Sequence, residues 1–317
     1  MDYLDYKSFW NERAASPAGA IAAVDGSQNE TTLQLTGAYS ARQVAAALAL
    51  RAGDRVFELG CGVGRIGREL AGHFSHWHGL DIAENMLAVA RDRLAGIDGV
   101  QLDVLTESRL TPLADASVDK GYCVAVFIHM DKEDFLLYLR DVARVLVPGG
   151  LFYFDHWNFA HPVGWRRFDL EVAQAAITPA NTRKNVARNQ FCIPEEVATY
   201  VRHAGLEIVH AQADSPWVQM VVRKPDGDAA AAERESARCR AQAATIAYEP
   251  KWTEYFDGLL DAEIDRQPPH ALQAKLAAAA QTELVTRMYR AYLRGLWALR
   301  TEQWGPVPAE LDLEITA

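Results

Sequence analysis

Short apolar runs alternate with longer amphipathic stretches through the middle of the chain, and this pattern predicts strands that alternate with helices. Each apolar run has the length of a strand, and each amphipathic stretch carries an apolar face at helical spacing. The predicted strands lie at residues 56–59, 76–82, 99–105 and 151–157, and within residues 116–130. Strands at this spacing indicate a parallel sheet that helices cover on both faces.

After this alternating region, the pattern predicts one more helix and a closing pair of strands. The helix covers residues 193–205, because a proline suits its first turn and a glycine suits its end. Two apolar runs follow at residues 206–213 and 217–225, and we expect them to form an antiparallel pair. Residues 160–192 are largely polar, and we expect them to form loops on the substrate side.

Both ends of the chain predict helical additions to the sheet. Residues 1–50 are expected to form an N-terminal helical cap, residues 51–225 the core, and residues 229–317 a C-terminal helical extension. In the cap, we expect Ser40 to begin a helix as its N-cap after a polar stretch.

The C-terminal extension carries an apolar stripe at helical spacing. It is formed by Leu284, Met288, Tyr292, Leu296 and Leu299. An exposed stripe of this length would promote association, so it must be buried. We expect it to form either a lid over the cleft, which we favour, or the contact of a homodimer.

Composition narrows the classes of function. The 317 residues are half apolar and 23% charged, which is typical of a globular protein with one catalytic domain and additions. The net charge of −10 argues against nucleic acid as the main partner. The four cysteines lack the spacing of a zinc site or a disulfide framework. With no evident targeting segment or membrane span, we expect a cytoplasmic protein without a membrane partner.

The most informative stretch is DRVFELGCGVGRIG, residues 54–67, which predicts a strand, a tight turn and the start of a helix. Glycines let the backbone approach a ligand closely, and a helix N-terminus offers unpaired N–H groups to an anionic group. The spacing also fits the G-x-G-x-x-G pattern of nicotinamide dinucleotide-binding proteins. However, Glu58 at the strand end would repel a pyrophosphate, whereas an ammonium or sulfonium group would tolerate it.

Two acids follow the next two strands and indicate which nucleotide would bind. Asp81 ends the second strand, where its two oxygens can accept hydrogen bonds from both hydroxyls of a ribose. Asp103 ends the third strand and could accept from an adenine amino group, with Val104 and Leu105 beside the ring. The alternatives are that Asp81 caps the next helix and that Asp103 is an ordinary loop residue. Together with Glu58, these acids favour a nucleotide other than NAD.

This assembly resembles the class I S-adenosylmethionine-dependent methyltransferases over roughly residues 36–224. The strongest elements of the resemblance are VFELGCGVGR, GLDIAENML, LDV and RVLVPGGLFYFD. The resemblance implies an α/β fold with a Rossmann-like, mostly parallel seven-stranded sheet and helices on both faces. It implies that residues 217–225 supply a reversed edge strand, and that the cofactor is S-adenosyl-L-methionine.

The resemblance also implies which residues bind that cofactor. From its amino-acid end to its adenine, they are Glu58, Gly60, Cys61, Gly62 and Gly64, then Asp81 and Ile82, then Asp103 and Val104. The glycine loop with its acid would face the amino-acid end. Asp81 would hold the ribose, Ile82 would pack on the adenine, and the last two residues would read the adenine edge.

Methyl transfer from a sulfonium is an in-line displacement, so the site must align the acceptor with the methyl group and exclude water. We expect a small-molecule acceptor that reacts at a hydroxyl oxygen. The hydroxyl must lose a proton, which His129 or His156 could accept, and His129 is preferred. A divalent ion held by Asp131, Asp155 and Asn158 is the alternative, although their loose spacing leads us to expect no metal.

Aromatic and basic residues after the fifth strand are candidates for the acceptor pocket. They are Trp157, Phe159, Trp165, Phe168, Arg166, Arg167, Arg183, Lys184 and Arg188. The aromatic rings could wall a pocket for a flat acceptor, and an arginine could hold an acidic group. The alternatives are an ordinary core and a solvated surface.

Other functions stay open on the sequence alone. The protein could methylate RNA or another protein, or it could bind S-adenosylmethionine without catalysis. An NAD-dependent dehydrogenase is a further alternative, since the glycine spacing fits it as well.

Overall fold

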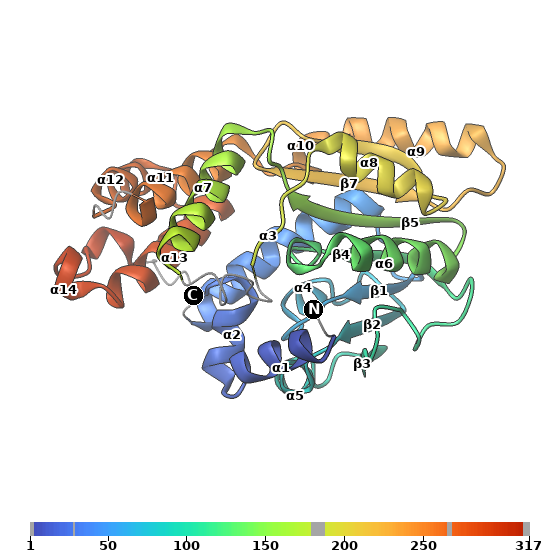
Figure 1. Ribbon diagram of the computed structural model, residues 1–317, viewed down its shortest axis with the longest axis horizontal. Coiled ribbons are helices and arrows are strands. Elements are labelled where there is room, and N and C mark those ends of the chain that lie inside the picture. Colours follow the sequence, from blue (N-terminus) through green and yellow to red (C-terminus); the bar gives the residue numbers. More distant parts are fainter. Residues whose placement is uncertain (1–2, 28, 179–187, 265–267, 313–317) are drawn as a thin grey trace.

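The computed structural model describes residues 3–27, 29–178, 188–264 and 268–312. At its centre lies a seven-stranded sheet in the order β3-β2-β1-β4-β5-β7-β6 (Figure 1). The strands are β1 (Arg55–Leu59), β2 (His76–Asp81), β3 (Val100–Val104), β4 (Val118–Cys123), β5 (Leu146–Trp157), β6 (Glu207–Gln212) and β7 (Trp217–Arg223). β7 is antiparallel to β5 and β6, and the other neighbours are parallel. The predicted sheet is confirmed, and its reversed strand lies one position in from the edge.

Helices cover both faces of this sheet and extend beyond its end. Those up to the last strands are α1 (Tyr3–Arg13), α2 (Pro17–Asp25), α3 (Glu30–Leu48), α4 (Arg65–Glu69), α5 (Glu84–Arg93), α6 (Lys132–Val145), α7 (Pro162–Ile177) and α8 (Pro194–His203). Those after the sheet are α9 (Ala229–Ala241), α10 (Ala243–Ile246), α11 (Pro250–Ile264), α12 (His270–Ala278), α13 (Leu284–Ala298) and α14 (Thr301–Trp304). Short 3-10 turns lie at η1 (Phe127–His129) and η3 (Ala309–Leu311).

The alternation of side chains along β1 shows how the two faces become buried. Phe57 packs in the core that the sheet forms with α6 and α8, whereas Val56 packs in the core formed with α3, α4 and α5. α6 buries Phe135, Leu139 and Val142, which recur at helical spacing on one face. The sheet is therefore buried on both sides, and its ligands must bind at the carboxyl ends of the strands.

The helix before the sheet is longer than the sequence predicts. α3 begins at Glu30, and the Oδ1 of Asn29 caps it by accepting from the backbone N–H of Thr32 at 2.9 Å. Ser40 therefore lies inside the helix rather than at its start, and its hydroxyl accepts from Arg65 at 3.1 Å. The polar residues that suggested a loop form the first turns of α3, because Asn29 caps as well as serine does.

Part of the polar stretch after β5 is also helical. We expected loops over residues 160–192, but residues 162–177 form α7, which starts with Pro162 and is capped by the ring Nδ1 of His161. The aromatic residues Phe159, Trp165 and Phe168 pack edge to face at this helix start. The helix packs on α11, to which Arg166 is tied by ion pairs with two aspartates.

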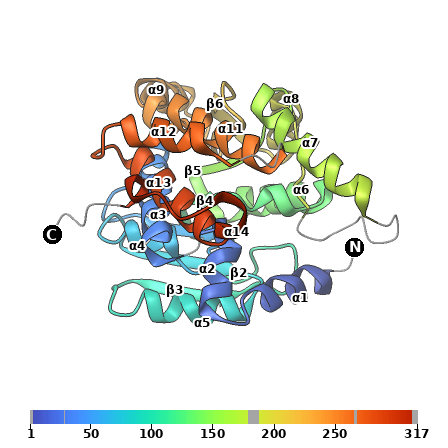
Figure 2. The same ribbon diagram turned by 90° about the vertical axis from the view of Figure 1, so that its left-hand side faces the viewer.

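The C-terminal segment divides between two positions in space. α9 packs beside β6 and α10 beside α3, whereas α11, α12 and α13 form a separate helical layer beyond the end of the sheet (Figures 1 and 2). α13 packs against α3, where Met288 is buried, while Leu299 at the end of the predicted stripe is 67% exposed. Within the described ranges, no helix is both long and apolar enough to cross a membrane.

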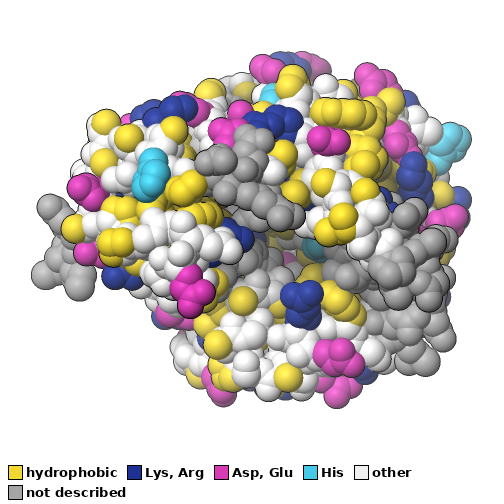
Figure 3. All heavy atoms as spheres, turned by 60° about the vertical axis from the view of Figure 1, so that its left-hand side comes forward, with side chains coloured by type: hydrophobic (Ala, Val, Ile, Leu, Met, Phe, Trp, Pro, Cys, Tyr) yellow, Lys and Arg dark blue, Asp and Glu magenta, His cyan; other side chains and the backbone are white. Residues whose placement is uncertain are grey.

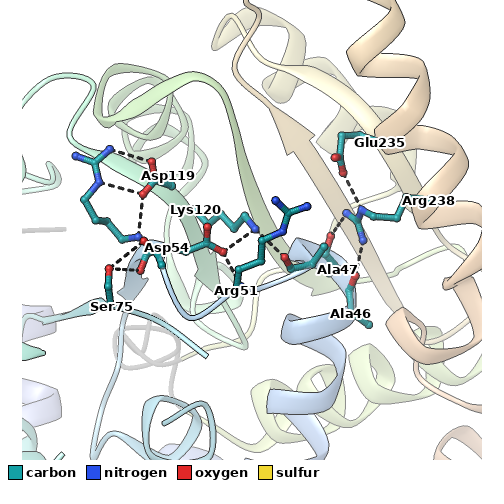
Figure 4. A network of polar contacts seen from close by, with 12 residues as sticks. Ala46, Ala47, Arg51, Asp54, Ser75, Asp119, Lys120, Glu235 and Arg238 are labelled. Atoms are coloured by element: carbon teal, nitrogen blue, oxygen red, sulfur yellow. Dashed lines mark hydrogen bonds and ion pairs between the residues drawn. The ribbon is translucent and has the colours of Figure 1, made fainter. Parts of the chain in front are cut away.

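A network of polar contacts joins the segments at the opposite end of the sheet (Figure 4). The guanidinium group of Arg238 in α9 donates to the carbonyl oxygens of Ala46 and Ala47 at 2.6 Å each. These carbonyl groups belong to the last turn of α3, where carbonyl oxygens have no hydrogen-bond partner within the helix. Lys120 of β4 donates to Ala49 and pairs with Asp54. The network fixes α3 and α9 to the sheet and leaves the other end free to form a site.

Candidate functional site

The glycine turn after β1 requires glycine at its first position. Gly60 has a φ of 72°, and a Cβ atom there would lie 2.4 Å from the side chain of Val126. A larger residue would therefore be strained and would also collide with the loop after β4. The backbone of this turn is thus held close to the open end of β1, where it can approach a ligand.

Asp81 at the end of β2 holds the same turn. Its Oδ2 accepts from the backbone N–H of Gly62 at 2.8 Å, and its Oδ1 accepts from the N–H of Ala83 at 2.9 Å. Burial raises the pKa of this carboxyl above its ordinary value, although the backbone N–H groups lower it. Each carboxylate oxygen can accept a further hydrogen bond, so Asp81 can hold a ribose while it shapes the glycine turn.

Two consecutive hydrogen bonds from aromatic side chains hold the carboxylate of Glu58 in place. Trp77 Nε1 donates to the hydroxyl of Tyr122 at 2.9 Å, and that hydroxyl donates to the Glu58 Oε2 at 2.7 Å. Burial raises the pKa of Glu58 to about 8, while the hydrogen bond from Tyr122 and the charge of Arg65 lower it. A cation beside Glu58 would favour its ionised form.

These residues border a first cavity at the carboxyl ends of β1 and β2. Its wall at the strand ends is formed by Glu58, Gly60, Cys61, Gly62, Asp81 and Ile82. Tyr6, Trp10, Ala23 and Val24 cover it from α1 and α2, and Val124, Ala125, Val126 and His129 close it from the loop after β4. The geometry therefore brings six of the predicted cofactor-binding residues together around one cavity.

Three predicted cofactor-binding residues lie outside the lining of this cavity. The Oδ2 of Asp103 lies 2.7 Å from His78 Nε2 and accepts from Gln101 Nε2 at 2.7 Å. Val104 packs against the core that the sheet forms with α3, α4 and α5, whereas the next residue, Leu105, lines the cavity. Gly64 caps α4 with a φ of 71°. The placement of Asp103 differs from the expectation because a strand neighbour, His78, supplies its partner.

A second cavity adjoins the first. Aromatic side chains form a large part of its walls: Phe9, Trp10, Tyr39, Trp157, Trp217, Tyr248, Trp252, Phe256, Tyr289 and Tyr292. The two cavities share Trp10, Ala23, Val24, Arg65, Val124, Ala125 and His129. Figure 3 shows the molecular face on this side hollowed at its centre, with hydrophobic side chains along the rim. A ligand in one cavity can therefore reach a ligand in the other.

The two histidines predicted as bases lie in different environments. His129 lines both cavities, and its ring lies 5.2 Å from that of Trp10. His156 lines neither cavity; its ring faces Phe135 of α6, and its Nε2 lies 3.6 Å from the Cys192 sulfur. Burial lowers the pKa of His156 to about 4. The geometry thus favours His129 as a base and gives no support to His156.

The predicted alternative is a divalent ion; in the described ranges, no group of at least three His, Cys, Asp or Glu residues is arranged to hold a metal ion. The Asn158 side chain is already used, because its Nδ2 donates to two carbonyl oxygens and its Oδ1 accepts from Ala160. Asp131 is the N-cap residue of α6, whereas Asp155 lies in β5 and Asn158 directly follows that strand. Among the predicted basic residues, Arg183 and Lys184 lie outside the described residues.

Asp155 joins the core to the C-terminal segment at the boundary between the cavities. Its Oδ1 accepts from the N–H of Ala125 at 2.7 Å, and its Oδ2 accepts from the hydroxyl of Tyr248 at 3.1 Å. Ala125 has a φ of 58°, a left-handed conformation that costs energy for a residue other than glycine. Asp155 therefore holds a strained loop that leads directly to His129. Burial raises the pKa of Asp155 to about 7.

Sequence reasoning missed part of the second cavity. Tyr248 of the C-terminal segment lines it, as do Phe9 and Trp10 of α1. These residues are far apart in the sequence, and none belongs to a recognisable motif. The only signal was their aromatic character, which suits a pocket wall and a core equally.

Comparisons with known proteins agree with this geometry. Residues 56–150 match a family described as Methyltransferase domain. Methyltransferase GfsG of Streptomyces halstedii is 38% identical over 107 residues, which cover 32% of this chain and 37% of that protein. The ubiquinone biosynthesis O-methyltransferase of Xylella fastidiosa is 29% identical over 174 residues, covering 52% of this chain and 66% of that protein. The chain thus spans between 37% and 66% of the length of these curated relatives.

A solved structure shares the fold. Magnesium protoporphyrin IX methyltransferase from Synechocystis PCC 6803, with bound SAH, has a TM-score of 0.53 at 16% identity and covers 70% of this chain and 100% of its own. The glycine turn held by Asp81, the acid at the end of β1 and the first cavity fit S-adenosylmethionine as the cofactor. Residues 56–150 thus form a methyltransferase domain, as the resemblance to the class I S-adenosylmethionine-dependent methyltransferases predicts.

Proposed function

We propose that this protein transfers the methyl group of S-adenosylmethionine to a hydroxyl oxygen of a small molecule. The observation that carries this proposal is the meeting of two cavities at His129, one with a cofactor-binding lining and one with aromatic walls. The relatives named as O-methyltransferases support an oxygen acceptor.

His129 acts as the base in this proposal. The acceptor oxygen attacks the methyl carbon, the bond from that carbon to the sulfonium sulfur breaks, and S-adenosylhomocysteine leaves. The hydroxyl proton passes to the His129 imidazole, so charge does not build up on the oxygen. Because His129 lines both cavities, it lies beside the path between acceptor and methyl group.

The helices at both ends of the chain enclose the reaction. α1 and α2 cover the first cavity, and side chains of α11 and α13 wall the second. We infer that the C-terminal helices serve as the lid that the apolar stripe predicts, since Met288 and Tyr292 face the second cavity. Excluding water in this way favours the displacement over side reactions.

Methyl-labelled S-adenosylmethionine tests the proposal. The full chain is incubated with a metabolite extract, and separately with total RNA and total protein, and the label is followed in each fraction. We expect the label in small molecules. Treatment with base should not release it, because the methyl group is held in an ether linkage. Label only in RNA or protein would show a macromolecular acceptor, and no labelled product in any fraction would contradict the transferase function.

A further inference from the structure

The second cavity has a wall of stacked aromatic rings. Trp157 and Trp217 stack with ring centroids 4.1 Å apart, and Trp217 stacks on Tyr248 at 5.4 Å. Trp252 and Phe256 stack at 5.0 Å, and Phe256 continues onto Trp157. These stacked rings form a continuous aromatic wall of the cavity, which favours a planar ring over a branched aliphatic ligand.

Two buried hydrogen-bond donors on the lining of this cavity lack acceptors. Within the described part of the chain, neither Trp217 Nε1 nor Arg167 Nη1 has a hydrogen-bond partner. Trp217 itself is only 5% exposed. Leaving a buried donor unpaired costs free energy, so an acceptor atom on a ligand would gain from meeting either group.

The two donors belong to one wall. Arg167 Nη2 and Asn189 Nδ2 both contact the Glu171 Oε1 at 2.8 Å. The Asn189 Oδ1 in turn accepts from Trp157 Nε1 at 3.3 Å, and Trp157 stacks on Trp217. A connected set of contacts thus positions both donors beside the aromatic stack.

The charge of this wall decides what kind of acceptor atom it favours. Glu171 compensates the guanidinium charge of Arg167. Asp25 lies 3.8 Å from Arg65, so two of the three arginines that line the cavity are paired with a carboxylate. A carboxylate on the ligand would face repulsion from Glu171, whereas a neutral carbonyl oxygen would not. The wall therefore offers hydrogen bonds without a net positive charge.

We propose that the second cavity binds a planar aromatic hydroxy-ketone, with its ring against this aromatic wall and its carbonyl oxygen accepting from the free N–H groups of Trp217 and Arg167. This inference rests on the proposed function and names its substrate class. The hydroxyl at the other end of such a molecule points toward His129, which lies at the junction of the two cavities.

Calorimetry on the full chain, saturated with S-adenosylhomocysteine, tests this recognition with three probes. They are a naphthol with a distal acetyl group, the same naphthol with a carboxylate in that place, and the parent naphthol. We expect the ketone to bind about fivefold more tightly than either of the others. Tightest binding by the carboxylate, equal binding by the parent, or no binding by any probe would overturn the proposal.

Two matched variants locate the preference. Trp217→Phe keeps the stack but removes the N–H group, so we expect the ketone to lose most of its advantage over the parent naphthol. Trp252→Phe removes an indole from the same cavity and should leave that advantage unchanged. Equal losses in both variants would mean that ring area alone decides, which contradicts the proposal.

Arg167→Met tests the second donor in the same way, and unchanged S-adenosylhomocysteine affinity confirms folding in each variant. Transfer is measured separately with labelled cofactor and the ketone probe. Binding of the ketone without labelled product would count against the proposed methyl transfer while leaving the recognition intact. Transfer to the parent naphthol at the same efficiency as to the ketone would overturn the recognition alone.

Discussion

The two cavities are built from the same chain in different ways. The strand-end wall of the first cavity comes from two consecutive strand-turn units, between Glu58 and Ile82. The second cavity gathers side chains from Phe9 to Tyr292, which come from both ends of the chain and from β5 and β7 between them. The strand-end wall of the first cavity is thus a local product of the sheet, whereas the second cavity exists only after the whole chain has folded.

This difference explains why one cavity has a sequence signature and the other does not. In a parallel sheet, the order of strands fixes which loops meet, so residues after β1 and β2 lie together in any chain with this topology. No such rule places α1 or α11 against the sheet. The chemistry of the second cavity is therefore free to vary while the first keeps its role.

The largest expected effect concerns the junction of the cavities. His129→Ala should lower the rate of methyl transfer to a hydroxyl about 100-fold, because the proton acceptor is lost. Cofactor affinity, measured by calorimetry with S-adenosylhomocysteine, should change little. His156→Gln serves as the control, and it should retain most of the rate because His156 lines neither cavity. A larger loss of rate in the His156 variant than in the His129 variant would show that His129 is not the base.

The next effect should be confined to the first cavity. Asp81→Ala removes the proposed ribose ligand and the acceptor for Gly62, so S-adenosylhomocysteine affinity should fall at least about tenfold. Asp119→Ala is the control, because its carboxylate pairs with Arg55 at the far end of the sheet. Unchanged affinity in the Asp81 variant would remove this residue from the site.

A smaller effect should appear in the pH dependence of stability, through the link between the cavities. The pKa of Asp155 is raised from 3.8 to about 7 in the folded protein, so the unfolded chain loses this proton first. The ionisation of Asp155 therefore lowers the free energy of unfolding as pH rises from about 4 to 7, by at most about 1.4 kcal/mol per pH unit.

Asp155→Asn tests this sign because the amide keeps an acceptor for Ala125 and does not ionise. Denaturant unfolding at several pH values should give a shallower decline in this variant than in the unaltered protein. Parallel curves for the two proteins would show that Asp155 ionises normally in the folded state.

The smallest effect is expected at Asp103. Because this carboxylate is paired with His78 and Gln101, Asp103→Ala should change S-adenosylhomocysteine affinity by less than about threefold. Calorimetry beside the Asp81 variant provides the comparison. A loss as large as that of the Asp81 variant would restore Asp103 to the adenine edge, as the family resemblance implies.

Sequence reasoning succeeded where one strand or turn decides the outcome. The glycine turn, the position of Asp81 at the end of β2 and the reversed strand were predictable because each depends on residues close in sequence. It was less informative about His129 and His156, since both follow apolar runs. The alternation along β5 turns His156 toward α6 and Asp155 toward Ala125, and register of this kind is visible only in the folded sheet.

The same limit applies to helices and partners. Ser40 and Asn29 are both good N-caps, and packing of α3 on the sheet decided in favour of the longer helix. Asp103 found a partner across the sheet in His78, which its own sequence neighbourhood could not reveal. Tyr248 reaches Asp155 from 93 positions away.

The shared cover of the cavities has a thermodynamic consequence. Trp10, Ala23 and Val24 of α1 and α2 contact both cavities, so a ligand that stabilises this arrangement on one side acts on the other side as well. Binding linkage is reciprocal: the factor by which the acceptor tightens the cofactor equals the factor by which the cofactor tightens the acceptor. The two dissociation constants are therefore coupled through one pair of N-terminal helices.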